Sequence, residues 1–317
     1  MHHHRIILKN FTPKDGTISF STLSELSEKL TALAESAVSS LMEGNSRPGQ
    51  GKRPEWLKEV TDFMLSGLHE GSTVLELDAP EIQSISQNKQ FALFDEPEAD
   101  ELLHESAFGL LTYLYERAGE HEKGSNLLDK HLLRRMRGFE KLLKSEEAEI
   151  LFETEGKSKV SSFTLNKKSL NKISIVEQET PESLKTSVVG ELDTMRHKKQ
   201  QMELITGDGK RIRAVPGADQ NIRSLKEYFG QRVKITGLAH FKSDKSIKSL
   251  EILDIRKAEP NEEHHEELTQ PIFEDIDLKY LASEQGWTGF DEKKFRKTIK
   301  DMDVQESPEE LLRLLKS

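Results

Sequence analysis

The chain has 317 residues and a formal net charge of −10, and it contains no cysteine. Without cysteine, a disulfide scaffold, a cysteine-ligated metal site and thiol chemistry are all excluded. No apolar run reaches the roughly 20 residues that a membrane-spanning helix needs, and no signal-peptide pattern opens the chain. We therefore expect a cytoplasmic, mostly globular protein. The histidines at 2–4 are either natural or the remnant of a tag, and no expectation rests on them.

The N-terminal segment predicts a hairpin followed by a helix. Residues 5–11 and 17–20 have strand-like patterns on either side of the turn sequence Pro-Lys-Asp-Gly. From Thr22 with Glu25, a capping-box spacing, apolar residues recur every three or four positions as far as Leu41. This period indicates an amphipathic helix.

A second helix and a strand are expected next. Pro54 suits the first position of a helix, and apolar residues continue at helical spacing to Leu68. Residues 73–77 then read as a strand. The order predicted for the N-terminal unit is therefore ββααβ.

A loop rich in glycine and proline, residues 44–54, joins the two predicted helices. Its cationic residues are Arg47, Lys52 and Arg53, which suit an acidic partner. The loop is either a binding element of this kind or a plain connection.

The middle of the chain is predicted to be mostly helical. Residues 98–144 show two helical periods separated by a break at 119–124, which predicts a helical pair. Short strands are expected at 150–152 and 160–165, and 169–177 is either a helix or a strand.

The segment 188–257 has the most readable pattern. A strand at 188–194 and a hairpin around Asp208-Gly209 are followed by a short helix at 221–229 and strands at 233–241 and 249–256. Three strands, one helix and two strands in this order resemble the OB-fold, a five-stranded Greek-key barrel.

The same segment, joined to an N-terminal α+β unit, contains a pattern written GxLDxxRH…DGxxI…GxxVxxxG. It resembles uncharacterised bacterial accessory proteins that are encoded beside toxin or phage-defence genes. The resemblance implies a genomic context and no mechanism. The matching residues are Gly190, Leu192, Asp193, Arg196, His197, Asp208, Gly209, Ile212, Gly230, Val233 and Gly237.

Charge is segregated along the chain. Residues 188–257 carry 15 Lys and Arg against 9 Asp and Glu, a net charge of +6, whereas the remainder carries −16. One face of the predicted barrel would then present a cationic surface, which is typical of phosphate-backbone binding. The alternatives are a protein-docking or scaffolding surface, ordinary solubilising residues, and pairing with the acidic remainder of the chain. Exposed aromatic residues, on which single-stranded bases stack, are missing from the alternating strand. The candidate binding residues are Arg196, Lys198, Lys199, Arg211, Arg213, Arg232, Lys234, His240 and Lys242.

The sequence carries no recognisable motif of catalysis or cofactor binding. There is no Walker-type phosphate loop, no GxSxG and no HExxH. The string of acids and histidines at 262–267 is the most metal-like sequence, but adjacent ligands in a linker do not fix a geometry. Arg117 and His121 do not have the spacing of a catalytic motif. Neither His104 nor His131 belongs to such a motif. We expect no catalytic residue, no metal site and no cofactor.

These patterns predict a multidomain α+β protein. Residues 1–187 would hold the ββααβ unit and the helical pair, 188–257 the OB-like barrel, and 258–317 an acidic linker with C-terminal helices. We expect a non-enzymatic adaptor or regulatory subunit that acts through protein–protein contacts, with a protein partner or self-association into an oligomer, and with no membrane. The alternative is a protein that binds DNA or RNA through the basic face of the barrel.

Overall fold

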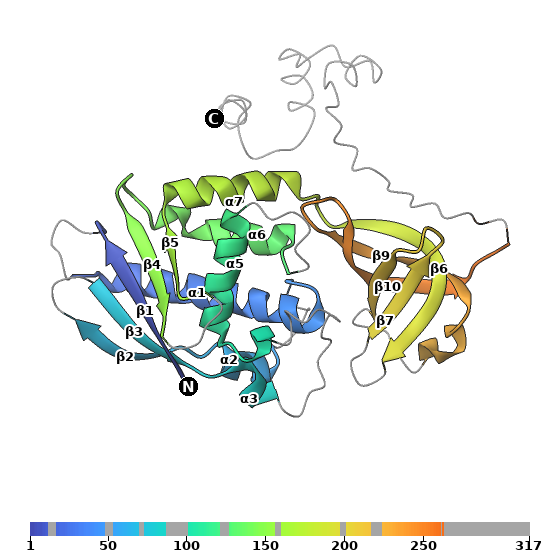
Figure 1. The fold of residues 1–317 in the computed structure, drawn as a ribbon, viewed down its shortest axis with the longest axis horizontal. Helices are drawn as coiled ribbons and strands as arrows, with labels where there is room; N and C mark the ends of the chain where they lie inside the picture. The colour runs from blue at the N-terminus through green and yellow to red at the C-terminus, as the bar shows by residue number, and fades with distance from the viewer. Residues whose placement is uncertain are drawn as a thin grey trace, which may run out of the picture. The chain divides into compact units, whose positions relative to one another are not determined.

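The computed structural model shows a mixed α+β architecture with an antiparallel sheet and a closed five-stranded barrel (Figure 1). No helix in the described part of the chain is long and apolar enough to cross a membrane. The predicted acidic tail lies almost wholly outside the described residues. The structure describes residues 1–11, 17–47, 53–69, 73–86, 101–120, 127–155, 160–196, 201–216, 224–260 and 262.

The sheet is antiparallel throughout, in the order β2-β3-β1-β4-β5. Ile6 of its central strand lies opposite Leu75 on one side and Phe152 on the other, and all three are buried. The other face carries polar residues together with Ile7, Val74 and Leu151, and Arg5 forms an ion pair with Glu155 there. The sheet therefore has one core face and one outer face. The strands are β1 (His2–Lys9), β2 (Met64–His69), β3 (Thr73–Ala79), β4 (Glu149–Thr154) and β5 (Ser162–Leu165).

Helices cover the core face of this sheet and contribute most of its core. The predicted amphipathic helix is present as α1, with Leu26, Leu30 and Leu33 buried. It begins two residues before Thr22, because Ser19 is the N-cap, and it ends at Gly44, whose φ of 77° is left-handed. The helices are α1 (Phe20–Glu43), α2 (Glu55–Val60), α3 (Ile82–Ser86), α5 (Ala107–Gly119), α6 (Lys130–Arg137), the 3₁₀ turn η1 (Gly138–Lys141) and α7 (Lys167–Glu179).

The predicted order ββααβ is wrong, and the observed order is βααββ. Residues 17–19 form no strand, because Ser19 already caps α1. The second helix ends at Val60, and residues 64–69, predicted as its continuation, form β2. Gly67 lies inside this stretch and would weaken a helix by about 1 kcal/mol. The apolar residues that fit a helical period instead pair with β3.

The later elements agree better with their predictions. The helical pair is present as α5 and α6, and both short strands are present as β4 and β5. Residues 167–179, left open between helix and strand, form the helix α7 with a capping box between Asn166 and Ser169.

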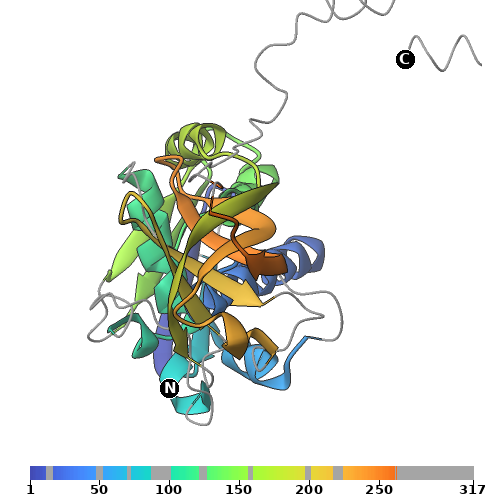
Figure 2. The ribbon, with the colours of Figure 1, turned by 90° about the vertical axis from the view of Figure 1, so that its right-hand side faces the viewer.

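The barrel has the strand order β10-β8-β7-β6-β9, and the pairing of β9 with β10 closes it. Strands β8 and β10 are parallel and the remaining pairs are antiparallel. This closed five-stranded barrel is compatible with an OB-like fold. In Figure 2 its yellow-to-orange strands wrap around a common interior. The elements are β6 (Leu184–Arg196), β7 (Gln201–Thr206), β8 (Arg211–Pro216), the 3₁₀ helix η3 (Ser224–Tyr228), β9 (Arg232–Phe241) and β10 (Ile247–Lys257).

Strict alternation on β9 points Val233 and Ile235 into the barrel core, as predicted. Gly237 is required by the pairing of β9 with β10, because a Cβ there would lie 2.3 Å from the backbone oxygen of Glu251. The predicted Asp-Gly turn joins β7 to β8, with Gly209 at a φ of 79°. Below, residues 1–180 are called the body and residues 184–257 the barrel.

Candidate functional site

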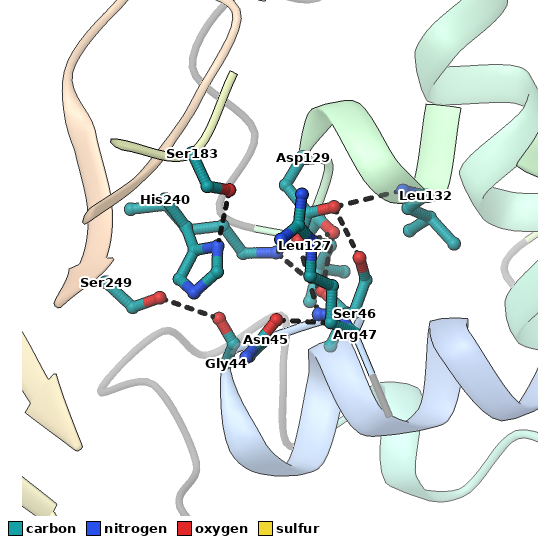
Figure 3. Close-up of polar contacts among 12 residues, drawn as sticks. Gly44, Asn45, Ser46, Arg47, Leu127, Asp129, Leu132, Ser183, His240 and Ser249 are labelled. Carbon is teal, nitrogen blue, oxygen red and sulfur yellow. Dashed lines mark hydrogen bonds and ion pairs between the residues drawn. The ribbon is translucent and has the colours of Figure 1, made fainter. Parts of the chain in front are cut away.

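A buried polar network joins the barrel to the body (Figure 3). The body contributes residues from the C-terminal end of α1 and from the turn before α6. The barrel contributes residues from β10. Ser249 of β10 donates to the backbone oxygen of Gly44 at 3.0 Å. The C-terminus of α1, where the helix dipole is negative, therefore lies against a strand of the barrel.

Lys248 is the centre of this network. Its side chain is fully buried, and its ammonium donates to Asp129 at 2.8 Å, to the hydroxyl of Ser40 at 2.7 Å and to the backbone oxygen of Leu127 at 3.1 Å. An ammonium has three protons to donate, and each has an acceptor here. All three acceptors belong to the body, so the barrel buries this charge entirely against the other part of the chain.

Asp129 is held from three directions. It is the N-cap of α6 and accepts from the backbone N–H of Leu132 at 3.0 Å. Ser46 donates to it through its hydroxyl and its backbone N–H. Burial by itself would raise the pKa of Asp129, but the charge of Lys248 and these hydrogen bonds hold the pKa well below its usual range. The carboxylate is therefore charged and paired at neutral pH.

Two of the predicted binding residues are buried at this junction. The guanidinium of Arg213 packs on Gly44, since a Cβ on that glycine would lie 2.5 Å from Nη1. Burial lowers the pKa of Arg213 to about 10, although Glu43 and Glu203 attract its charge. His240 has 2% of its surface exposed, and its Nδ1 lies 2.9 Å from the hydroxyl of Ser183.

Other predicted cations are engaged in ion pairs on the barrel surface. Arg211 lies 3.4 Å from Glu203. Lys234 lies 3.4 Å from the carboxylate of Glu262, and Arg232 donates to the backbone oxygen of that residue. A hydrogen bond from Arg256, together with its charge and Lys234, lowers the pKa of Glu262 to about 2. The acidic residue that follows the barrel thus neutralises part of the basic surface.

The remaining predicted residues do not converge on one surface. Lys242 lies partly exposed in the β9–β10 turn, and Arg47 is exposed after α1. Arg53 lies at 2.6 Å from Glu35 of α1. Those predicted cations that the structure describes are therefore not brought together on one exposed face. The side chain of Arg196 and the residues Lys198, Lys199 and Lys52 lie outside what the structure describes.

An open groove lies between α1, α2 and the sheet. Its volume is about 690 Å³, within the size range of ligand and peptide sites. Leu23, Leu26 and Leu30 of α1 form one wall, and the floor is the core face of the sheet at Leu75 and Leu77. The groove reaches β2, which is an edge strand of the sheet.

The side chain of Leu65 at the end of this groove is apolar and 47% exposed. Met64 is 54% exposed, but it pairs with Asp78 on the outer face of the sheet and does not line the groove. A β-bulge between Leu65 and Gly67 changes the direction of the strand here. Exposed apolar residues on an edge strand are a surface that proteins normally avoid unless something binds there.

The rim of the groove is acidic. Glu35 and Glu55 have cationic neighbours, namely Arg53 at 2.6 Å and Lys58 at 3.9 Å. Glu59 and Asp62 are exposed and form no ion pair with any described residue.

Neither the network nor the groove was predicted from the sequence. Residues 64 and 65 were placed in a helix, and Gly67 within the predicted helix was the available signal. Lys248 was placed just outside the last strand, and nothing in its local sequence indicates that it is buried. Of the predicted residues, Arg53 is the one that lines the groove.

The histidines considered as catalytic or metal-ligating residues have ordinary surroundings. His104 lies 2.9 Å from Glu81, and His131 accepts from Arg135 at 3.0 Å. Within the described ranges, no group of three or more histidine and acidic residues is placed to hold a metal. His121 and residues 263–267 lie outside those ranges.

Comparison with known proteins adds no relative. No family model matches the chain, and no curated protein and no solved structure matches it.

Proposed function

We propose that the chain is a non-catalytic adaptor or regulatory subunit that acts through protein–protein contacts. The observation that carries this proposal is the exposed apolar end of β2 beside the groove. Leu65 is 47% exposed where an edge strand, an apolar wall and an open volume meet, and Met64 is 54% exposed on the opposite face of the same strand. A partner that covers these side chains would gain about 25 cal/mol for each Å² of apolar surface removed from water.

The network between body and barrel supports the same function. A buried ion pair gives little net stability, because desolvation offsets much of the attraction, yet a partner lost from the pair is costly. Lys248 and Asp129 therefore favour one arrangement of the two parts over others. A fixed arrangement suits a protein that presents a surface to a partner.

Nucleic-acid binding by the barrel is the second candidate. Its support is the barrel fold, which is compatible with an OB-like fold, together with Lys242 and Lys245 in the β9–β10 turn. Against it, Arg213 is buried, and Lys234 has Glu262 as a neighbour. The cations left for phosphate contacts are therefore few among the described residues.

The test uses a photo-crosslinking amino acid placed at position 65 in the full chain, expressed in the cells that naturally make it. Position 175 on α7 is the matched control, since Ile175 is 50% exposed and Leu65 is 47% exposed. We expect a discrete crosslinked protein at position 65 and none at 175. Equal crosslinking at both positions, or none at 65, would contradict the proposal.

A further inference from the structure

We infer that the groove between α1, α2 and β2 takes a segment of a partner protein in which apolar side chains are flanked by lysine or arginine. This inference rests on the proposed function and names the chemistry of its partner. Three features carry it: the apolar floor and wall, the two rim acids that form no ion pair with a described residue, and the exposed side chain of Leu65.

The apolar part of the segment follows from the lining of the groove. Leu26 and Leu30 on α1 face Leu75 and Leu77 of the sheet across the groove, and the volume of about 690 Å³ accommodates several side chains. Leu65 extends this surface to the edge of the sheet. The four leucines that face one another across the groove are already buried, so the apolar surface that a segment would cover belongs mainly to Leu65 and to the partly buried Leu23 and Phe63. A polar segment that covered this surface would lose hydrogen bonds to water without replacement.

The basic part follows from the charge of the rim. Six charged side chains line the groove, four acidic and two basic. Both basic residues already form ion pairs, Arg53 with Glu35 and Lys58 with Glu55. Glu59 and Asp62 remain, and both are exposed. Their field attracts a cation at the rim and repels an acid, so it selects among apolar segments by charge.

Rim charges act mainly on the rate of association and on specificity, and their effect decreases with salt. The inferred partner segment therefore has two separable contributions to binding. The apolar contribution depends on Leu65, and the electrostatic contribution depends on Glu59 and Asp62. A variant of Leu65 and a variant of the two acids test the two contributions separately.

The experiment selects binders from a displayed library of random 12-residue peptides on the immobilised full chain. Peptides that lose binding to the variant L65D are kept, and their affinities are measured against E59K/D62K. The control is E147K/E227K, which reverses two exposed acids outside the groove. Thermal unfolding verifies that each variant is folded.

We expect the retained peptides to carry lysine or arginine beside apolar residues. E59K/D62K should weaken them by about tenfold, which corresponds to about 1.4 kcal/mol, while E147K/E227K should not change their affinity. Retained peptides without basic residues, or an unchanged affinity for E59K/D62K, would overturn the inference and leave the proposed function standing. A dimer of this chain that depends on Leu65, seen by light scattering of the full chain, would overturn it as well. Failure of the crosslinking at position 65 would instead remove the proposed function itself.

Discussion

His4 shows how a single buried residue makes stability depend on pH. Its ring stacks on Phe108 with the centroids 4.5 Å apart, and its Nε2 lies 2.8 Å from the hydroxyl of Ser106. That hydroxyl accepts from the backbone N–H of Gly109, so its own proton is directed to His4. Thr154 lies 3.2 Å from Nδ1. Burial, with smaller contributions from His2 and His3, lowers the pKa of His4 to about 3. The histidine run is thus part of the sheet and of its core.

We predict that stability decreases as the pH falls from about 6.5 towards 3 because of His4. The unfolded chain binds a proton in this range and the folded chain does not, so folding loses up to about 1.4 kcal/mol per pH unit. Replacing His4 by glutamine should flatten this part of the curve of unfolding free energy against pH, measured by urea denaturation. H104Q is the control, because His104 is exposed. Equal slopes in wild type and H4Q would contradict the assignment.

The buried pair Lys248 and Asp129 gives a second prediction about single residues. K248M leaves a buried carboxylate without its counter-charge and should lower the unfolding free energy by about 3–5 kcal/mol. D129N leaves a buried ammonium in the same situation and keeps a residue suited to the N-cap of α6. The double variant should therefore lose less than the sum of the two single variants, as measured by a double-mutant cycle in urea. Additive losses would show that the two charges are not coupled.

At the scale of elements, local patterns were predicted and long-range pairing was not. The period of α1 and the alternation of β9 each lie within one element, so the sequence shows them directly. Strand β2 depends on pairing with β3, and residues 64–68 fit a helical period equally well. Because residues 64–68 were predicted as a helix, the groove beside β2 could not be predicted from the sequence.

The network could not be predicted for a related reason. Lys248 and Asp129 are 119 positions apart in the sequence. Lysine on an outward position of a barrel strand is ordinarily a solvated residue. His240 and Arg213 were assigned to an exposed face because the alternation of their strands points them out of the barrel. The guanidinium of Arg213 is buried against Gly44 of the body, and His240 is buried beside Ser183.

Strand β9 carries a prediction about its own pairing. G237A places a methyl group against the backbone of β10, where the added carbon would lie 2.3 Å from the oxygen of Glu251 and the strands would have to separate. Such overpacking should lower the unfolding free energy by about 1–3 kcal/mol or more. G138A is the control, since a Cβ at Gly138 meets nothing within 4 Å and its φ of −54° suits alanine. Thermal unfolding of both variants measures the difference, and a G237A protein as stable as G138A would contradict the close approach.

At the scale of the whole molecule, charge segregation has a different use from the one that the sequence indicated. The segment 188–257 carries +6 while the rest of the chain carries −16. In the structure, part of that positive charge is directed inward, with Lys248 against Asp129 and Arg213 against the end of α1. Charge complementarity thus holds the barrel on the body. The exposed apolar surface at β2 is then the feature that a partner would recognise.

The most direct test of this account is what co-purifies with the native full chain. The wild type is compared with M64D/L65D on β2 and with R211E/K242E on the barrel, and both protein and nucleic acid are measured in each complex. We predict a stable protein complex that R211E/K242E retains and M64D/L65D loses. Co-purified nucleic acid that R211E/K242E loses and M64D/L65D retains would contradict the account and assign the function to the barrel.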